Sequence, residues 1–212
     1  EELAWADSGY ADTFVTGFVA FRNILLAGTP AQARRFADVL APGAFAAFCL
    51  TEAGAGSDVA ALRTTAVLDG DEYVINGTKS FITNGSIASL YVVFAKTDPA
   101  AGARGITGFL VDGSAPGLSA GAKEHKMGFR LSDTCEVVFD NVRVPREAVI
   151  GEVGGGMAVA LGALNLSRAF ISTLAVGIMQ RALDEAVAYA RERRQFGRPI
   201  IEFEMVQAML AD

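Results

Sequence analysis

One apolar stretch near the end of the sequence limits the possible folds more than any other feature. Between Gly154 and Gln180 the only charged residue is Arg168. The stretch is long enough to cross a membrane, but Arg168 lies near its middle, where an arginine costs about 2.5–3.5 kcal/mol on insertion scales. A helix that is apolar all round and lies outside a membrane belongs at the centre of a helical bundle. We therefore predict a long bundle helix that ends near Arg194, and no membrane span.

Arg168 belongs to a stripe of residues that recur every three or four positions along this helix. The stripe comprises Met157, Leu161, Leu164, Arg168, Ile171, Ala175, Ile178, Ala182, Ala186, Tyr189 and Arg193. An arginine is rarely buried without a partner. A structural ion pair with a carboxylate and a ligand anion held by the guanidinium group both fit this position. The residues alone leave both interpretations open.

The first part of the chain has a different helical pattern. In residues 1–45 apolar residues recur every three or four positions, which predicts amphipathic helices. Gly28 is typical of a helix end, Thr29 of an N-cap and Pro30 of a first helical turn. We therefore expect one helix to end and another to begin between Gly28 and Pro30.

Residues 46–150 change to short β-branched and aromatic runs separated by turn signals. Asn76-Gly77 and Asn84-Gly85 favour hairpin turns. No helical pattern alternates with these runs, so a Rossmann unit is excluded. The pattern predicts an antiparallel sandwich or barrel.

The composition excludes several classes of protein. Of 212 residues 51% are hydrophobic and 20% charged, which is typical of a globular protein. A net charge of −6 gives no reason to expect nucleic acid or an anionic membrane as a partner.

Cys49 and Cys135 are far apart in apolar surroundings, which predicts buried thiols in a reducing compartment, the cytoplasm. His125 is the only histidine and lies among charged residues, so we expect it at the surface. One histidine and two distant cysteines predict neither a metal site nor a nucleophile–base pair.

Both ends of the sequence lie within helical patterns, and the chain does not begin with Met. We expect a piece of a longer protein.

A glycine-rich loop follows an apolar run in the middle of the chain. The run "AFAAFCL" leads into "TEAGAGSD" at residues 51–58. Successive backbone N–H groups without a Cβ in the way can hold a phosphate, and the same residues also suit an ordinary turn. Glu52 and Asp58 flank the loop, but nothing marks them as an acid–base pair. A second candidate is the run Lys79, Phe81 and Thr83, which by period two shares one strand face and fits either a planar ligand or ordinary core.

The long helix ends in a basic segment, "RERRQFGR", which Gly197 and Pro199 terminate. Cations at a helix C-terminus offset the helix dipole, so a solvated cluster is one interpretation. At a rise of about 1.5 Å per residue, Arg193 lies roughly 37 Å from Arg168. One ligand headgroup cannot contact both, which implies two anion sites or none.

Several motifs stand in a characteristic order. They are "FCLTEAGAGSDVAALRTTA", "YVINGTKSFITNG", "ITGFLVDGSAPGL", "KMGFRLSDTCEVVFDNVRVP", "NLSR" and "RERRQFGRPI". In this order they resemble the acyl-CoA dehydrogenase family, and the resemblance extends over nearly all 212 residues. The resemblance implies an α+β multidomain fold: the end of an N-terminal helical domain at 1–45, a middle antiparallel β-barrel or sandwich at 46–150, and the start of a C-terminal helical bundle at 151–212. In that family FAD lies between the β-domain and the bundle.

The resemblance also assigns binding residues. Those matched to FAD are Phe48, Leu50, Thr51, Gly56, Ser57, Phe81, Ile82, Thr83, Arg193, Gln195 and Phe196. Of these, Arg193, Gln195 and Phe196 match a segment that reaches the FAD of a neighbouring subunit. Ser57, Asn165 and Arg168 match residues that hold the acyl-CoA substrate. Two positions depart from the family pattern: Phe81 stands where Trp is usual, and Glu204 where a FAD-contacting Gln is common.

The activity implied is α,β-desaturation of an acyl-CoA thioester, in which a glutamate removes the α-proton and the β-hydrogen leaves as hydride to flavin N5. A minority of the family carry that glutamate immediately before the CoA-binding arginine, where this chain has Ser167, which cannot serve as a base. No catalytic residue is therefore assigned in this segment, and the base is expected beyond Asp212.

The resemblance further implies a homodimer or homotetramer and electron-transferring flavoprotein as electron acceptor. Two alternatives stay open. One is a flavin oxidase or monooxygenase relative that passes electrons to oxygen, and the other is a truncated, inactive protein that binds CoA or acts as a scaffold.

Overall fold

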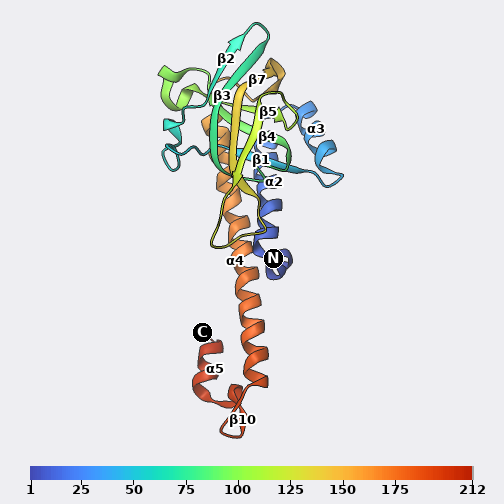
Figure 1. The fold of residues 1–212 in the computed structure, drawn as a ribbon, viewed down its shortest axis with the longest axis vertical. Helices are drawn as coiled ribbons and strands as arrows, with labels where there is room; N and C mark the ends of the chain where they lie inside the picture. Colours follow the sequence, from blue (N-terminus) through green and yellow to red (C-terminus); the bar gives the residue numbers. More distant parts are fainter. Residues whose placement is uncertain (212) are drawn as a thin grey trace.

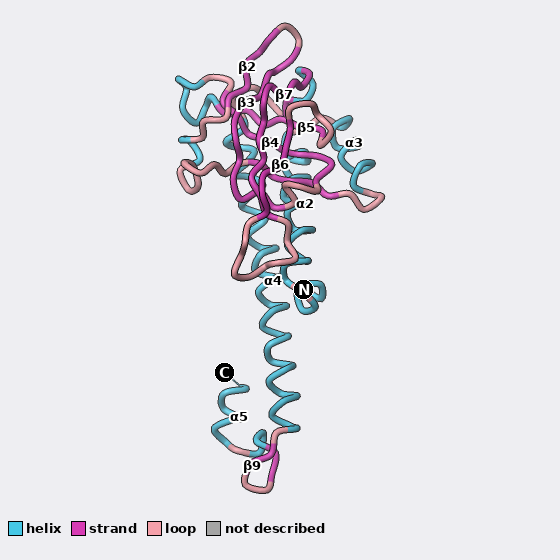
Figure 2. Tube along the Cα trace, viewed as in Figure 1, coloured by secondary structure: helices cyan, strands magenta, loops and turns pink. Residues whose placement is uncertain are grey.

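The structure is a computed structural model that describes residues 1–211. Helices from the N-terminal part pack against a β-domain, and one long helix begins at that domain and extends far beyond it (Figure 1). The chain thus has an N-terminal helical part, a middle sheet and a C-terminal helix, as predicted. Figure 2 shows that the strands gather at one end of an elongated molecule.

Three helices form the N-terminal part: α1 (Glu2–Ala6), α2 (Ser8–Ala27) and α3 (Pro30–Leu40). Gly28 follows the last residue of α2, and Thr29 caps α3. The Thr29 hydroxyl accepts from the backbone N–H of Gln32, and the Gln32 side chain accepts from the backbone N–H of Thr29. This reciprocal pair satisfies two helix-end donors and fixes the turn between α2 and α3, so the predicted helix boundary is confirmed.

The middle part is one eight-stranded sheet. Its strands are β1 (Phe45–Cys49), β2 (Thr65–Asp69), β3 (Glu72–Thr83), β4 (Ala88–Lys96), β5 (Ile106–Asp112), β6 (Leu118–Lys123), β7 (Thr134–Pro145) and β8 (Val149–Ile150). The order along the sheet is β6-β7-β3-β2-β4-β5-β8, with β1 on β4. Most pairs are antiparallel, as predicted, but β1 runs parallel to β4, and β2 meets β4 in one parallel pairing.

Both hairpin predictions were wrong. Asn76-Gly77 lies inside β3, where the pairing with β7 shifts register between Ile75 and Gly77. Gly77 is needed there because its φ is +151° and a Cβ would come within 2.5 Å of the Thr64 hydroxyl. Asn84-Gly85 does form a turn, but it joins β3 to β4, which are not neighbours in the sheet. The turn of the β2–β3 hairpin contains Gly70 instead.

Two buried clusters hold the β-domain together. One lies within the sheet and includes Tyr73, Ile82, Phe109, Val137 and Phe139. The other lies between the sheet and the helices. It brings together Ile24 of α2, Phe36 of α3, Phe94 of β4 and Ala160 near the start of the long helix. Because this second cluster locks the helices to the sheet, it fixes the groove in which side chains from α2, β1, β3 and the long helix meet.

The C-terminal part consists of α4 (Gly156–Glu192), a small antiparallel pair of β9 (Arg194–Gln195) and β10 (Arg198–Pro199), and α5 (Glu204–Ala211). Short 3₁₀ turns lie at Val59–Ala61, Pro99–Gly105, Arg146–Ala148 and Ile200–Glu202. The predicted long helix is confirmed, and it ends two residues before Arg194.

Much of the surface of α4 is apolar and exposed within the described residues. The long side chains of Leu161, Phe170, Ile171, Met179 and Leu183 are among those exposed. By length and composition α4 would qualify as a membrane span, and 22% of its most apolar window is buried. That a helical bundle surrounds α4 stays a prediction.

Candidate flavin and thioester site

One pocket of about 520 Å³ brings together residues from four elements that are distant in sequence. Its lining consists of Thr16 and Val19 of α2, Phe48, Leu50, Thr51, Gly56, Ser57 and Val59 on and after β1, Phe81, Ile82 and Thr83 of β3, and Leu161, Leu164 and Arg168 of α4. We call this the central pocket. All of the predicted site residues from the glycine loop and from the end of β3 lie on it.

The glycine loop after β1 forms one wall of the central pocket. Glu52 and Ala55 exchange two backbone hydrogen bonds of 3.1 and 3.0 Å, which close a tight turn. A Cβ built on Gly54 or Gly56 would meet no atom within 4 Å, so both glycines adjoin open space. The exposed Ser57 follows at once. The loop therefore presents bare backbone and a hydroxyl to the pocket, which is the chemistry that suits a phosphate.

The end of β3 forms the adjoining wall, since the Ser80 backbone N–H donates to the Thr51 carbonyl at 2.9 Å. Phe81 has a φ of +58° and is 63% exposed. A bulky residue in this left-handed region is an outlier that the fold has to support. The pairing with β7 shifts register between Lys79 and Ile82, and Phe81 lies inside that shift. The half-buried Thr83 lines the same pocket two residues later, so Phe81 and Thr83 share a face as predicted.

The prediction that Lys79 lies on that same face was wrong. Its side chain is fully buried and pairs with Glu52 at 2.8 Å. Lys79 and Ser80 are both buried, so the register shift breaks the period-two alternation before Phe81. Period two cannot reveal such a bulge, because nothing in the residue types of the strand marks it.

Arg168 reaches the central pocket from α4 together with Leu161 and Leu164, so this part of the stripe faces one pocket. Its side chain is exposed and donates to Asn165 Oδ1 at 3.1 Å. Among the described residues no carboxylate lies within ion-pair distance of Arg168. The structural ion pair is therefore not what holds this arginine, and its guanidinium group is free to bind an anion.

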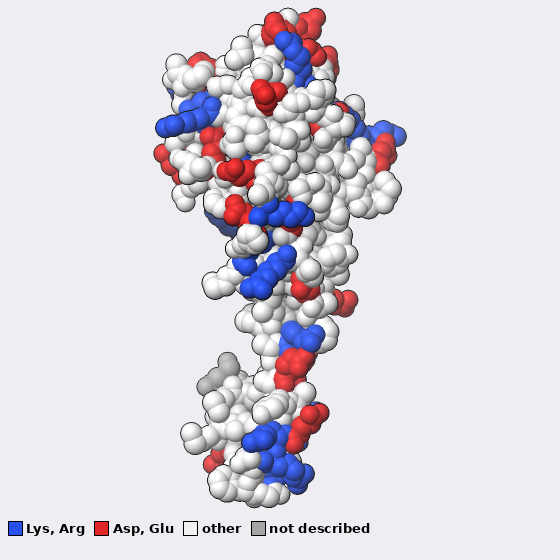
Figure 3. Space-filling view, in the orientation of Figure 1, with Lys and Arg blue, Asp and Glu red and all other residues white. Residues whose placement is uncertain are grey.

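The residues at the far end of α4 do not join the central pocket. Arg193 and Gln195 lie there beside Phe196, which is 94% exposed with a φ of +52°. The basic side chains of this end form a positive patch in Figure 3. Since α4 is continuous from Gly156 to Glu192, this patch and the central pocket are two separate sites. Glu204, the departure from the family pattern, is the first residue of α5 and is exposed at the same end.

No Asp or Glu is among the residues that line the central pocket in residues 1–211. Ser167 is buried, and its hydroxyl donates to the backbone carbonyl of Leu164.

His125 is exposed and lies outside the central pocket, as predicted for a surface residue. Cys49 and Cys135 are buried free thiols, and burial raises the pKa of the Cys135 thiol to about 11. No group of metal-ligating side chains is found among the described residues.

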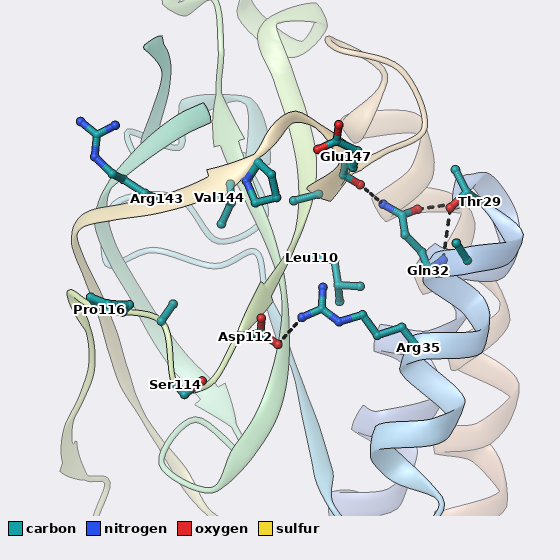
Figure 4. Close-up of a pocket in the computed structure, with 14 residues that line it drawn as sticks. Thr29, Gln32, Arg35, Leu110, Asp112, Ser114, Pro116, Arg143, Val144 and Glu147 are labelled. Carbon is teal, nitrogen blue, oxygen red and sulfur yellow. Dashed lines mark hydrogen bonds and ion pairs between the residues drawn. The ribbon is translucent and has the colours of Figure 1, made fainter. Parts of the chain in front are cut away.

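Another pocket lies between α3 and the strands β5 and β7 (Figure 4). Two of its polar side chains, those of Arg35 and Gln32, are engaged in contacts that cross the pocket. Arg35 pairs with Asp112, and the Gln32 amide donates to the backbone carbonyls of Glu147 and Val149. These contacts attach α3 to the β-domain, and none of the predicted site residues lies here.

The comparisons with known proteins agree with this geometry. The sequence model for the acyl-CoA dehydrogenase middle domain matches residues 47–142, and that for the acyl-CoA dehydrogenase C-terminal domain matches residues 154–212. The chain is 45% identical, over 90% of its length and 46% of the relative's, to cyclohex-1-ene-1-carbonyl-CoA dehydrogenase of Syntrophus aciditrophicus. It spans about half the length of the curated relatives it matches.

Solved structures show the same fold. Butyryl-CoA dehydrogenase from Megasphaera elsdenii superposes with a TM-score of 0.96 at 41% identity, over 100% of this chain and 56% of that one. A chain in the structure described as electron transferring flavoprotein of Acidaminococcus fermentans gives a TM-score of 0.96 at 41% identity, over 99% and 56%. With two domain matches and whole-chain relatives of the same class, the chain belongs to the acyl-CoA dehydrogenase family.

Proposed function

We propose that the full-length protein is a FAD-dependent acyl-CoA dehydrogenase that introduces a double bond between the α and β carbons of an acyl-CoA thioester. The observation that carries the proposal is the central pocket, in which the glycine loop, the end of β3 and Arg168 face a common space. The similar proteins are named as dehydrogenases of acyl-CoA compounds, which supports the same reaction class.

The residues present fit a flavin. Phe81 offers an exposed aromatic face at the pocket wall, and Thr51 and Thr83 offer hydroxyl donors beside it. Open space at Gly56 leaves room for phosphate oxygens next to the backbone N–H groups of the loop. We infer that Phe81 packs beside the isoalloxazine ring and that Gly56 and Ser57 hold the pyrophosphate. When bound, FAD supplies the hydride acceptor of the reaction.

Arg168 and Asn165 are the residues of this chain that we assign to the CoA portion. Asn165 Oδ1 accepts from the guanidinium group at 3.1 Å, although Asn165 itself does not line the pocket. A planar guanidinium with free donors suits a phosphate or another oxygen-rich group. We infer that Ser57, which lines the same pocket, contacts both the cofactor and the thioester.

The proton-abstracting base comes from outside this segment in our proposal. Ser167 occupies the alternative position for that base, and its hydroxyl is already engaged with its own helix. A carboxylate brought into the apolar wall formed by Leu161 and Leu164 would have its pKa raised by desolvation, which a general base for an α-proton requires.

The proposal extends to the electron acceptor and to assembly. The proposed electron acceptor is electron-transferring flavoprotein. The proposed assembly is a homodimer or a homotetramer. The cytoplasmic location remains a prediction.

The test is the reaction itself, carried out on the full-length protein. Incubation with short, branched and cyclic acyl-CoA compounds and an artificial electron acceptor should give the 2-enoyl-CoA product. Reduced enzyme that reacts faster with oxygen than with the acceptor would favour an oxidase. Flavin binding without any product would favour the inactive scaffold.

A further inference from the structure

Lys79 and Glu52 form a buried ion pair directly behind the central pocket. The Lys79 side chain is 0% exposed and that of Glu52 9%. Neither residue lines the pocket itself. A lysine is almost never buried without a specific arrangement around it, so this pair needs an explanation.

The partners of the pair belong to both walls of the pocket. Lys79 Nζ donates to Glu52 Oε1 at 2.8 Å and to the backbone carbonyl of Leu50 at 3.1 Å. Leu50 and Glu52 flank Thr51 at the start of the glycine loop, whereas Lys79 lies two residues before Phe81. The ammonium group therefore ties the glycine loop to the end of β3.

Glu52 also binds the segment of chain that follows the loop. Its carboxylate accepts from the backbone N–H groups of Arg63 at 2.6 Å and Thr64 at 3.0 Å, and from the Thr64 hydroxyl at 2.6 Å. Burial alone would raise the pKa of this carboxyl, but the hydrogen bonds from Lys79, Thr64 and Arg63 lower it. Both the beginning and the end of the segment from 52 to 64 are thus attached to one charged group.

The same arrangement sets the position of Phe81. Since Lys79 turns inward to reach Glu52 and Ser80 is also buried, the strand bulges and Phe81 points outward. The Ser80 backbone N–H donates to the carbonyl of Thr51 at 2.9 Å, which gives a second link between the walls. The two residues before Phe81 are thus both held by the glycine loop, and the strained backbone of Phe81 directly follows them.

A buried ion pair is a poor source of stability, because apolar residues of similar volume often stabilise a fold as well or better. The pair therefore matters for the geometry of the pocket and not for stability. We propose that Glu52 and Lys79 are a positioning pair that holds the glycine loop and the end of β3 in register and thereby sets the shape of the flavin site. The proposal deepens the proposed function and rests on it.

The experiment compares four forms of the full-length protein: wild type, Lys79→Met, the double variant Glu52→Gln with Lys79→Met, and Arg143→Met. Lys79→Met leaves the Glu52 carboxylate unpaired, so thermal stability should fall. The double variant removes that buried charge and should recover most of the loss. Arg143→Met removes exposed ion pairs with Asp69 and Glu72 and is the control.

FAD affinity and the visible absorption spectrum of the bound flavin are the decisive readouts. In the double variant we expect FAD to bind roughly tenfold more weakly than in wild type, with a shifted absorption band, although stability is recovered. Arg143→Met should match wild type in both. If Lys79→Met and the double variant do not fold, Glu52→Gln alone still offers the Lys79 ammonium group an amide oxygen and the Leu50 carbonyl as acceptors, and it should show the same weakening.

The outcomes separate the two proposals. A wild-type protein that binds no FAD overturns the proposed function. A wild-type protein that binds FAD, with a folded double or Glu52→Gln variant of unchanged affinity and spectrum, overturns the positioning pair alone.

Discussion

At the scale of single residues, Phe81 and Phe196 share a rare feature. Both have a positive φ and both expose most of their ring, and both are residues that the family resemblance matches to FAD. A bulky residue in the left-handed region costs of order 1–3 kcal/mol, which the rest of the fold has to offset. An exposed aromatic ring held in that conformation gains nothing from burial in the described part of the chain, which is consistent with a role in ligand contact.

Phe81→Gly should therefore separate stability from function. Glycine adopts the same φ without strain, so the apo protein should become more stable by about 1 kcal/mol in thermal unfolding. FAD affinity should fall, because the aromatic face is lost. Phe129→Gly is the matched control, since Phe129 has a φ of +54° and lies outside the central pocket. Equal FAD affinity in the two variants would count against a flavin contact by Phe81.

Arg168→Ala tests the assignment of the CoA portion. Arg168 is exposed and its hydrogen-bond partner is Asn165, so the free energy of unfolding should change by less than about 0.5 kcal/mol. Acyl-CoA affinity should fall by about 2–5 kcal/mol, the range for removal of one partner of a charged contact.

Titration of the folded variant with acyl-CoA, with and without bound flavin, measures the effect of Arg168→Ala. Arg181→Ala is the control, because Arg181 lies on the same helix and pairs with Glu185 away from the pocket. Unchanged acyl-CoA affinity in a folded Arg168→Ala variant would refute the assignment.

At the scale of elements, α4 packs against the N-terminal helix α1 and also forms part of the central pocket. Trp5 of α1 donates to the Asp184 carboxylate at 2.7 Å, and the Arg181 guanidinium lies over the Trp5 ring at 4.5 Å. Gly177 permits this approach, because a Cβ there would come within 2.5 Å of the carbonyl of Glu1 and within 2.7 Å of Ala4 Cβ. A small residue at the crossing thus decides how closely α1 and α4 pack.

Gly177→Ala should therefore destabilise the protein although alanine is the better helix former. Overpacking against a backbone costs typically about 1–3 kcal/mol, which exceeds the gain of about 1 kcal/mol in helix propensity. Gly17→Ala is the matched control: Gly17 is also inside a helix, and its Cβ would meet nothing within 4 Å. Thermal unfolding should show a lower midpoint for Gly177→Ala and a higher one for Gly17→Ala. A rise in both would show that α1 does not pack on α4 as described.

The elements also show how far the sequence could be used for prediction. The boundary at Gly28 and Thr29 was predictable because capping depends on residues adjacent in the chain. The parallel pairing of β1 with β4 was not, since pairing partners are chosen by tertiary packing. The bulge at Phe81 was missed for the same reason: it depends on Lys79 reaching Glu52, 27 residues away. The motif order therefore identified the family and named residues that line one pocket, whereas the ion pair behind that pocket was visible only in the structure.

At the scale of the whole molecule, α4 separates the central pocket from the basic residues at its far end. The central pocket contains Arg168, and the far end of the helix holds Arg193 and Phe196 beyond the last turn. A continuous helix cannot bring that end back to its own pocket. We therefore propose that Arg193 and Phe196 serve the FAD of a neighbouring subunit.

Arg193→Glu should weaken assembly and flavin retention together, because one contact serves both the cofactor and the partner chain. Light scattering on the full-length protein, with and without FAD, measures the mass of the assembly. Glu202→Lys, a charge reversal of an exposed residue near the same end, is the control for a general change in charge. A wild-type monomer that retains FAD tightly would show that the shared-site proposal is wrong.

The central claim is that the glycine loop of the central pocket binds the phosphates of FAD, and Ser57→Asp tests it most directly. The substitution places a carboxylate where the pyrophosphate is proposed to lie, whereas Ser119→Asp adds the same charge at an exposed position on β6 outside the pocket. The measurement is the flavin absorbance of the purified full-length protein per mole of chain. We predict full occupancy in the wild type and in Ser119→Asp, and loss of flavin in folded Ser57→Asp. Full occupancy in Ser57→Asp would contradict the claim.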